Sequence, residues 1–235
     1  MVYCLAFDFS RFRIITFDCY GTLIDWEAGI LGAVRPILSA HGAHLGDAEI
    51  LRLYGEIEAD EESGEYRTYQ ETLRAVVRGF GTRLGFVPSN KEQQSLPDSL
   101  PNWRPFPDTV AALHRLKSKF NLGILSNVDD ELFSATARQL GINFDQVVTA
   151  SQARAYKPSL ELFRLAQSRV AVPPEQWLHA AQSVYHDVIP AQSLGLSTVW
   201  VNRPSLRPNI GAAKQASARP DVSVSSLQEL ADLAA

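Results

Sequence analysis

Residues 13–25 read RIITFDCYGTLID, and the chemistry changes abruptly in the middle of that run. Residues 13–17 form an apolar, β-branched segment that is too short and too continuous for a half-exposed strand, so we expect a strand buried on both faces. An acid, Asp18, follows at once, and Gly-Thr-Leu begins three residues later. Ligands of open parallel sheets bind beyond the carboxyl ends of the strands. Asp18 is therefore expected to project from a strand end into a site.

Further short apolar segments alternate with helical periods along the rest of the chain. Strands are predicted at 122–125, 146–150, 178–181 and 197–201. This alternation favours an α/β fold with a Rossmann-like parallel sheet. The stretch 203–225, which contains several proline and serine residues, is expected to wrap the edge of that sheet.

One region interrupts the alternation, because residues 27–102 show helical periods and no β-like run. Its apolar stripes are Ile30, Val34, Ile37 and Leu38, then Ile50, Leu51, Tyr54 and Ile57, then Tyr69, Leu73, Val76, Val77 and Phe80. An all-helical insert directly after the first strand predicts a cap over the sheet. We expect a core of residues 1–26 and 103–235 and a cap of residues 27–102, with hinges near 25–26 and 103–107.

The composition is that of a globular protein with a substantial core. The chain has 235 residues, 46% of them hydrophobic and 20% charged, and carries a net charge of -4. Nothing in this balance suggests binding to nucleic acid or to an anionic membrane. No run approaches the roughly 18 apolar residues of a membrane span, and the first residues lack a signal-peptide pattern. Two cysteines make neither a disulfide framework nor a metal motif, so we expect a cytoplasmic protein.

Reactive side chains follow four of the predicted strands. Asp18 ends the first, Ser126 and Asn127 end the second, Lys157 follows the third by a few residues and Asp187 follows the fourth. Parallel strands bring their carboxyl ends to one edge of a sheet. An acid, a hydroxyl, a cation and a second acid are therefore expected to converge there, and this convergence predicts an active site.

Four segments resemble the motifs of the haloacid dehalogenase superfamily, in the family's order. ITFDCYGTLID resembles the first motif, LGILSN the second, YKPSLELF the lysine motif and HAAQSVYHD the fourth. The helical insert lies where a large subgroup of that superfamily places its cap. The chain is thus identified as a member, and the resemblance implies a haloacid dehalogenase-like core with Asp18 as a nucleophile that forms an ester.

Two positions connect the chain to one subgroup. Phosphatases of the superfamily carry a second acid two residues after the nucleophile, where this chain has Tyr20, whose phenol is a poor proton donor at neutral pH. They also carry an acid where this chain has Gln182, which weakens a Mg²⁺ site. A departing halide needs no proton. The resemblance is therefore to (S)-2-haloacid dehalogenases, which hydrolyse small 2-haloalkanoic acids to 2-hydroxy acids and would require no cofactor.

That resemblance implies a set of roles. The implied catalytic residues are Asp18, Thr22, Ser126, Lys157 and Asp187, and the implied substrate-binding residues are Tyr20, Asn127, Arg67, Gln182 and His186. Ser126 and Thr22 would position carboxylates, and Asn127 would help to receive the halide. Lys157 would keep Asp18 ionised, and water activated near Asp187 would hydrolyse the ester.

The chain also departs from that subgroup. Phe163 stands where a tyrosine is usual, and Gln182 and Val184 stand where serine and asparagine are usual. The dehalogenases also place a halide-binding arginine on the cap, and the matching segment here, Leu53-Tyr54-Gly55-Glu56, has none. Arg67, which we prefer to Arg52, is the expected substitute.

Alternatives from other classes stay open. A Mg²⁺-dependent phosphatase of a small phosphoester would use Asp18, the Tyr20 carbonyl and Asp187 as metal ligands. A phosphonate-cleaving relative would need a cap lysine for a Schiff base, and the cap's only lysine is Lys91, in a polar stretch. A ligand-binding relative without turnover is a further alternative. The expected partner is a small halocarboxylate, and the apolar cap stripes are compatible with a homodimer.

Overall fold

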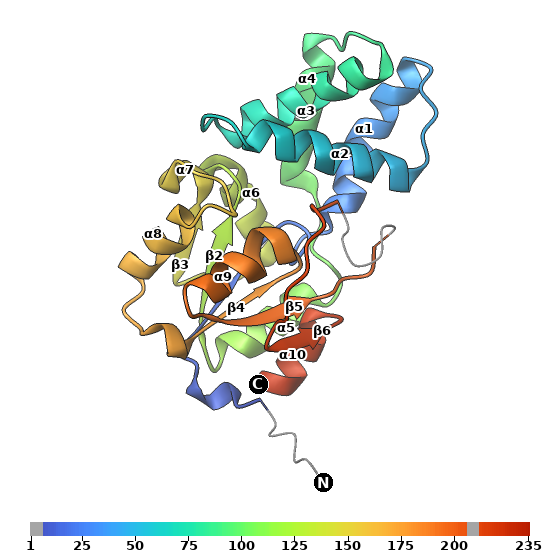
Figure 1. The fold of residues 1–235 in the computed structure, drawn as a ribbon. Coiled ribbons are helices and arrows are strands. Elements are labelled where there is room, and N and C mark those ends of the chain that lie inside the picture. Colours follow the sequence, from blue (N-terminus) through green and yellow to red (C-terminus); the bar gives the residue numbers. More distant parts are fainter. Residues whose placement is uncertain (1–6, 206–211) are drawn as a thin grey trace.

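The computed structural model of the chain describes residues 7–205 and 212–235. Its centre is a six-stranded parallel sheet with the order β3-β2-β1-β4-β5-β6 (Figure 1). The strands are β1 (Ile14–Phe17), β2 (Asn121–Ser126), β3 (Gln146–Thr149), β4 (Trp177–Ala181), β5 (Ser197–Val201) and β6 (Val222–Val224). The predicted α/β fold with a Rossmann-like parallel sheet is confirmed.

Strand β1 lies in the middle of the sheet, between β2 and β4. All four of its residues are buried, as its continuous apolar sequence predicts. Its last residue, Phe17, pairs with Ile124 of β2 and with Ala180 of β4. The following residue, Asp18, is therefore placed at the centre of the sheet's carboxyl edge.

Strand β6 was not predicted from the sequence. Residues 203–225 were expected to wrap the sheet edge, and the described part of this stretch adds a sixth strand instead, with Val222 paired to Val199 and Val224 to Val201. Residues 206–211 lie outside the described residues. Three residues with one exposed serine between two valines are too short a pattern to predict an edge strand.

Six α-helices among the described residues lie around the sheet (Figure 1). They are α5 (Thr109–Lys117), α6 (Asp130–Leu140), α7 (Ala150–Ala153), α8 (Glu161–Arg169), α9 (Ile189–Ser193) and α10 (Leu227–Ala234). Shorter turns are η1 (Phe9–Arg11), η2 (Leu100–Asn102), η3 (Pro174–Gln176) and the π-helical turn η4 (Val184–Val188). Within the described residues, no helix combines the length and the apolar character needed to cross a bilayer.

Four helices form a separate group at the other end of the molecule (Figure 1). They are α1 (Trp26–Ala40), α2 (Asp47–Glu62), α3 (Tyr69–Leu84) and α4 (Asn90–Ser99), and we call them the cap helices. The apolar stripes predicted three of them. The fourth, α4, buries only Leu96 and Pro97, and its sequence signal is the capping box of Ser89 and Glu92. The division into core and cap subdomains at the predicted boundaries stays a prediction.

Hydrogen bonds hold the cap helices against the core. The carboxylate of Asp129, in the loop after β2, accepts the backbone N–H groups of Tyr69 and Gln70 at 2.9 Å each. These are the first amides of α3, which have no partner inside the helix. Asp129 therefore acts as an N-terminal capping residue for α3. The Tyr156 hydroxyl also donates to the Arg67 carbonyl at 2.9 Å. Both contacts place the start of α3 over the carboxyl end of β2.

Candidate active site

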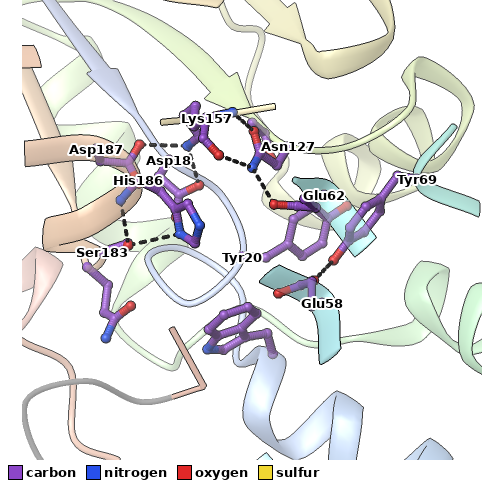
Figure 2. Close-up of a pocket in the computed structure, with 13 residues that line it drawn as sticks. Asp18, Tyr20, Glu58, Glu62, Tyr69, Asn127, Lys157, Ser183, His186 and Asp187 are labelled. Carbon is purple, nitrogen blue, oxygen red and sulfur yellow. Dashed lines mark hydrogen bonds and ion pairs between the residues drawn. The ribbon is translucent and has the colours of Figure 1, made fainter. Parts of the chain in front are cut away.

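A small cavity lies where the carboxyl ends of β1, β2 and β4 face α2 and α3 (Figure 2). Its volume is about 40 Å³. A cavity needs about 10–15 Å³ of accessible volume to hold one water molecule, so this one has room for a few waters or a very small molecule. Asp18, Ser126, Lys157 and Asp187 line it from the core side.

The Asp18 carboxylate is held through both of its oxygens. The Thr22 hydroxyl donates to Oδ2 at 2.7 Å, and the Lys157 ammonium donates to Oδ1 at 2.9 Å. The Thr22 hydroxyl in turn accepts the backbone N–H of Gln182 at 2.9 Å, so β4 helps to orient it. The turn between them requires Gly21, whose φ is +94° and whose missing Cβ would lie 2.9 Å from the indole nitrogen of Trp26.

Lys157 joins the two core acids. Its Nζ donates to Asp18 at 2.9 Å, to Oδ1 of Asp187 at 2.6 Å and to the Leu125 carbonyl at 2.9 Å. Burial favours the neutral amine, but the two carboxylates outweigh burial and raise the pKa of Lys157 above its usual value. An ammonium has three N–H groups, and here all three are used. Lys157 therefore has no donor left for a bound substrate.

The two acids differ in their surroundings. Burial raises the pKa of the Asp18 carboxyl, while Lys157 opposes that rise and the charge of Asp187 adds to it. Burial also acts on Asp187, but Lys157 and His179 outweigh it and lower the pKa of Asp187. Asp187 is thus held as a carboxylate, next to a second acid, Asp18, whose ionisation depends on Lys157.

A buried hydrogen-bond chain across β1 and β4 orients Asp187. The Trp177 indole N–H donates to the Thr16 hydroxyl at 2.7 Å, and that hydroxyl lies 2.8 Å from Nδ1 of His179. Nε2 of His179 lies 3.0 Å from Oδ1 of Asp187. Because indole can only donate, the Thr16 hydroxyl is free to donate onward to Nδ1. The satisfied tautomer of His179 then carries its proton on Nε2 and donates to Asp187.

Two polar atoms in this cavity have no partner among the described residues. They are the Ser126 hydroxyl and Oδ2 of Asp187, both buried. Buried polar atoms are rarely left unpaired, because the desolvation penalty is about 1–3 kcal/mol. Both residues line the cavity, so these atoms indicate groups that bind a ligand or a reacting water.

Comparison with known proteins places this geometry in a family. The model of the haloacid dehalogenase-like hydrolases matches residues 12–195. The chain belongs to this family. The predicted membership is confirmed, and so is the prediction of a hydrolase.

Individual relatives carry two kinds of activity in their names. An (S)-2-haloacid dehalogenase of Pseudomonas fluorescens is 26% identical over 224 residues, which is 92% of this chain and 93% of that protein. A glyceraldehyde 3-phosphate phosphatase of Methanothermobacter thermautotrophicus is 35% identical over 203 residues, or 81% and 85%. An L-2-haloacid dehalogenase of Xanthobacter autotrophicus, solved with chloropropionic acid covalently bound, is 20% identical with a TM-score of 0.77, over 94% and 98% of the two chains. The last similarity shows a shared fold.

Four of the five predicted substrate-binding residues of this family member line the cavity: Tyr20, Asn127, Gln182 and His186. The Tyr20 hydroxyl forms a 2.8 Å hydrogen bond with the Thr136 hydroxyl of α6, and burial raises its pKa well above the usual value. Burial also lowers the pKa of His186 to about 4, so its imidazole is neutral at pH 7. Neither side chain is a ready proton donor at that pH.

Asn127 has a different place from the one implied by the resemblance. Its Oδ1 accepts the Lys157 backbone N–H at 2.7 Å, and its Nδ2 donates to the Lys157 carbonyl at 3.1 Å and to Glu62 at 3.3 Å. Both amide hydrogens already face acceptors. Asn127 therefore holds the loop that carries Lys157, and it has no free hydrogen for a halide.

Arg67 does not reach the cavity. Its guanidinium pairs with Glu61 at 2.8 Å, and 39% of its side chain is exposed. It lines a different surface pocket, together with Glu71, Arg74 and Arg78. Arg52, the other substitute considered, pairs with Glu49 and Glu56 on the outer face of α2. Among the described residues, no arginine lines the cavity, and a halide-binding role of Arg67 stays a prediction.

The cap side of the cavity consists of residues that were not predicted from the sequence as site residues. Glu58 and Glu62 of α2, Tyr69 of α3 and Trp26 of α1 line it. A signal for Glu58 was present, because it continues the buried stripe of Ile50 and Tyr54 at a spacing of four. An acid on an apolar helix stripe needs a partner or a function. The core residue His179 was missed for a simpler reason, because it lies inside a strand.

The donor set of the alternative Mg²⁺ site is incomplete. Asp18 and Asp187 already pair with the ammonium of Lys157, and Gln182 stands where phosphatases of the superfamily carry a further acid. Mg²⁺ requires near-octahedral oxygen coordination. In the part of the chain that the structure describes, no group of three or more His, Cys, Asp or Glu could hold a metal. The residues therefore fit Mg²⁺ poorly.

Proposed function

We propose that this protein hydrolyses the carbon–halogen bond of small 2-halocarboxylic acids without a metal, in the cytoplasm. One observation carries the proposal. The carboxylate of Asp18 is fixed by Thr22 and Lys157, and no second aspartate follows it two residues later. The side chain at the acid position, Tyr20, is tied to Thr136. A halide leaves without a proton, so this arrangement suits halide displacement.

The proposed reaction has two steps. In the first, an Asp18 oxygen attacks C2 of the substrate, the C–O bond forms, and halide leaves with the electrons of the C–X bond. In the second, water gives a proton to the free Oδ2 of Asp187, and hydroxide attacks the Asp18 carboxyl carbon. The bond between the Asp18 carboxyl carbon and the substrate oxygen breaks, and the alkoxide takes up the proton from Asp187. The 2-hydroxy acid leaves, and Asp18 returns to its carboxylate by releasing the proton of the added hydroxyl group to water.

The other residues around the cavity bind and orient the substrate in this proposal. The unpaired Ser126 hydroxyl donates to the substrate carboxylate. The halide departs toward Gln182 and Trp26, whose side-chain N–H groups donate to no described residue. The cap helices close over the site and exclude water, with the hinges at 25–26 and 103–107. The cavity of about 40 Å³ restricts the substrate to a few carbon atoms.

A Mg²⁺-dependent phosphatase is the second candidate, because the phosphatase relative is 35% identical. The incomplete donor set and the Thr136-bound Tyr20 hydroxyl weigh against it. A homodimer stays a prediction under either candidate.

A paired assay distinguishes the candidates. Halide release from (S)- and (R)-2-chloropropionate is measured beside p-nitrophenyl phosphate hydrolysis, each with Mg²⁺ or with EDTA. We expect EDTA-insensitive halide release from the S enantiomer that is lost in Asp18→Asn and kept in the control Asp60→Asn, whose side chain is 76% exposed. Mg²⁺-dependent phosphate release would overturn the proposal. Activity on neither substrate would favour a ligand-binding relative without turnover.

A further inference from the structure

The cavity is unusually rich in carboxyl groups. Asp18, Asp187, Glu58 and Glu62 line it, and the only lysine or arginine among the described lining residues is Lys157. The three N–H groups of that lysine are used by Asp18, Asp187 and Leu125. His186 adds no charge at pH 7, because burial lowers its pKa to about 4. The core acids thus pair with one cation, and the two cap acids form no ion pair with a described residue.

Glu58 is fixed as a hydrogen-bond acceptor. The Tyr69 hydroxyl donates to its Oε1 at 2.7 Å (Figure 2), and the Tyr54 hydroxyl donates to the same oxygen at 2.8 Å. The residue is 6% exposed. Two phenols on one oxygen orient the carboxyl group rigidly. Its other oxygen, Oε2, has no hydrogen bond to a described residue.

Glu62 follows one helical turn later on α2. Its Oε2 receives only a long hydrogen bond of 3.3 Å from Asn127. Burial raises the pKa of Glu62 well above its usual value, and the neighbouring charge of Glu58 adds to the rise. Burial raises the pKa of Glu58 as well. Glu58 is buried and Glu62 is partly buried, and the lysine that lines the cavity is already shared by Asp18 and Asp187. Two carboxyl groups in this wall therefore cost free energy, which a cationic ligand would offset.

Two further atoms show that a ligand belongs in this cavity. The Ser126 hydroxyl and Oδ2 of Asp187 are buried there without a described partner. A simple haloalkanoate would satisfy Ser126 but would add a negative charge to a site with no free cation. A molecule with an ammonium group at one end and a carboxylate at the other would satisfy both walls and add no net charge.

We propose that Glu58 and Glu62 form a subsite for an ammonium group, so that the substrate is a small amino-substituted 2-halocarboxylic acid. This proposal rests on the proposed function for its reaction, but the subsite can be tested without turnover. The carboxylate lies toward Ser126, the halogen-bearing carbon lies against Asp18, and the ammonium donates to the free oxygens of Glu58 and Glu62. Binding of the cation stabilises both glutamates as carboxylates and releases any proton that they hold.

The first experiment measures binding of two unreactive probes, β-alanine and propionate, which differ by the ammonium group. Isothermal titration calorimetry is run in two buffers of different ionisation enthalpy. We expect β-alanine to bind at least about tenfold more tightly than propionate at pH 7, a difference of about 1.4 kcal/mol. We also expect proton release that accompanies β-alanine alone. Equal affinities, or tighter binding of propionate, would overturn the subsite.

Matched variants locate the effect. In Glu62→Gln, and in the double variant Glu58→Gln with Glu62→Gln, the preference for β-alanine and the proton release should disappear. Glu61→Gln is the control, because Glu61 lies on the same helix but pairs with Arg67 outside the cavity. Far-ultraviolet circular dichroism verifies that each variant is folded, and the single Glu62→Gln variant provides the test if the double variant is not. A preference that survives in folded Glu62→Gln would contradict the proposal.

The second experiment separates the subsite from the reaction. Halide release is compared for 3-amino-2-chloropropionate and 2-chloropropionate, and we expect kcat/KM to favour the amino acid by about 10–100-fold, or 1.4–2.8 kcal/mol. Equal kcat/KM values for the two substrates would refute the subsite but not the dehalogenation. Selective binding of β-alanine without halide release from either substrate refutes the dehalogenation alone.

Discussion

The carboxyl groups on the core wall and on the cap wall of the cavity differ in their partners. On the core wall, Asp18 and Asp187 share one ammonium and are further held by Thr22 and His179. On the cap side, which consists of Trp26, Glu58, Glu62 and Tyr69, Glu58 accepts from two phenols, and neither glutamate forms an ion pair with a described residue. The two core acids are therefore held in place by an ammonium group before a substrate arrives. The cap side lacks a cation paired with Glu58 and Glu62, so a substrate that brings a cation can be selected there.

Removal of Lys157, the cation shared by Asp18 and Asp187, should lower both activity and stability. In Lys157→Met, Asp18 and Asp187 face each other as buried acids without a counter-ion. We expect halide release to fall by about 10³-fold or more, and the free energy of unfolding to fall by about 3–5 kcal/mol. Urea unfolding and a halide assay measure the two effects. Lys117→Met, which removes a surface lysine paired with Asp145, should change neither by a comparable amount.

Loss of the buried hydrogen-bond chain should slow only the second step. His179→Phe removes the donor to Asp187 and leaves Asp18, Thr22 and Lys157 in place. We expect ester hydrolysis to slow by about 10–100-fold, as is usual for a residue that orients another, while halide release in the first turnover is retained. Mass spectrometry should then detect the alkylated enzyme. His179→Gln, which keeps a donor, should recover part of the rate, and an equal slowing of both steps would show a merely structural role.

The core wall could be predicted from the sequence, and the cap wall could not. Asp18, Ser126 and Asp187 follow apolar strands, and the geometry of a parallel sheet brings such positions together whatever the details of packing. Glu58 and Glu62 lie in the run EIEADEES, which also contains solvent-facing acids such as Asp60. Which face of a helix meets a cavity depends on how that helix packs against the rest of the protein. For the same reason, the sequence does not state that Arg67 lies outside the cavity.

The short elements escaped prediction for a related reason. The edge strand β6 is three residues long, and α4 buries two residues, so neither has enough apolar positions to define a period. The long stripes of α1, α2 and α3 were sufficient to predict a helical cap. The hydrogen-bond chain of Thr16, Trp177 and His179 depends on the register between β1 and β4, which a sequence does not state.

The free energy of unfolding should depend on pH through Glu62 on the cap wall. Burial raises the pKa of Glu62 above its ordinary value of 4.5, so the folded state binds its proton more tightly than the unfolded state does. The stability due to this proton is present below about pH 4.5 and is lost as the pH rises through the folded-state pKa. Glu62→Gln removes this loss. We expect the variant to gain about 1 kcal/mol over the wild type between pH 5 and pH 8 in urea unfolding, and parallel curves would contradict an uncompensated Glu62.

The smallest effect is expected outside both walls. Arg67→Gln breaks an exposed ion pair with Glu61, and such pairs contribute about 0–1 kcal/mol. We expect kcat/KM to change by less than about twofold, since the side chain does not line the cavity. A selective rise in KM of tenfold or more would show that Arg67 enters the site when the substrate binds.

A single turnover in H₂¹⁸O tests the central claim, that Asp18 attacks the substrate itself. With enzyme in excess over 2-halo acid, the oxygen added to the product comes from Asp18, and the heavy oxygen from water enters the enzyme. The account predicts unlabelled 2-hydroxy acid and a 2 Da increase in the peptide that contains Asp18, by mass spectrometry. Product that carries ¹⁸O from the first turnover, with an unlabelled peptide, would contradict the ester mechanism.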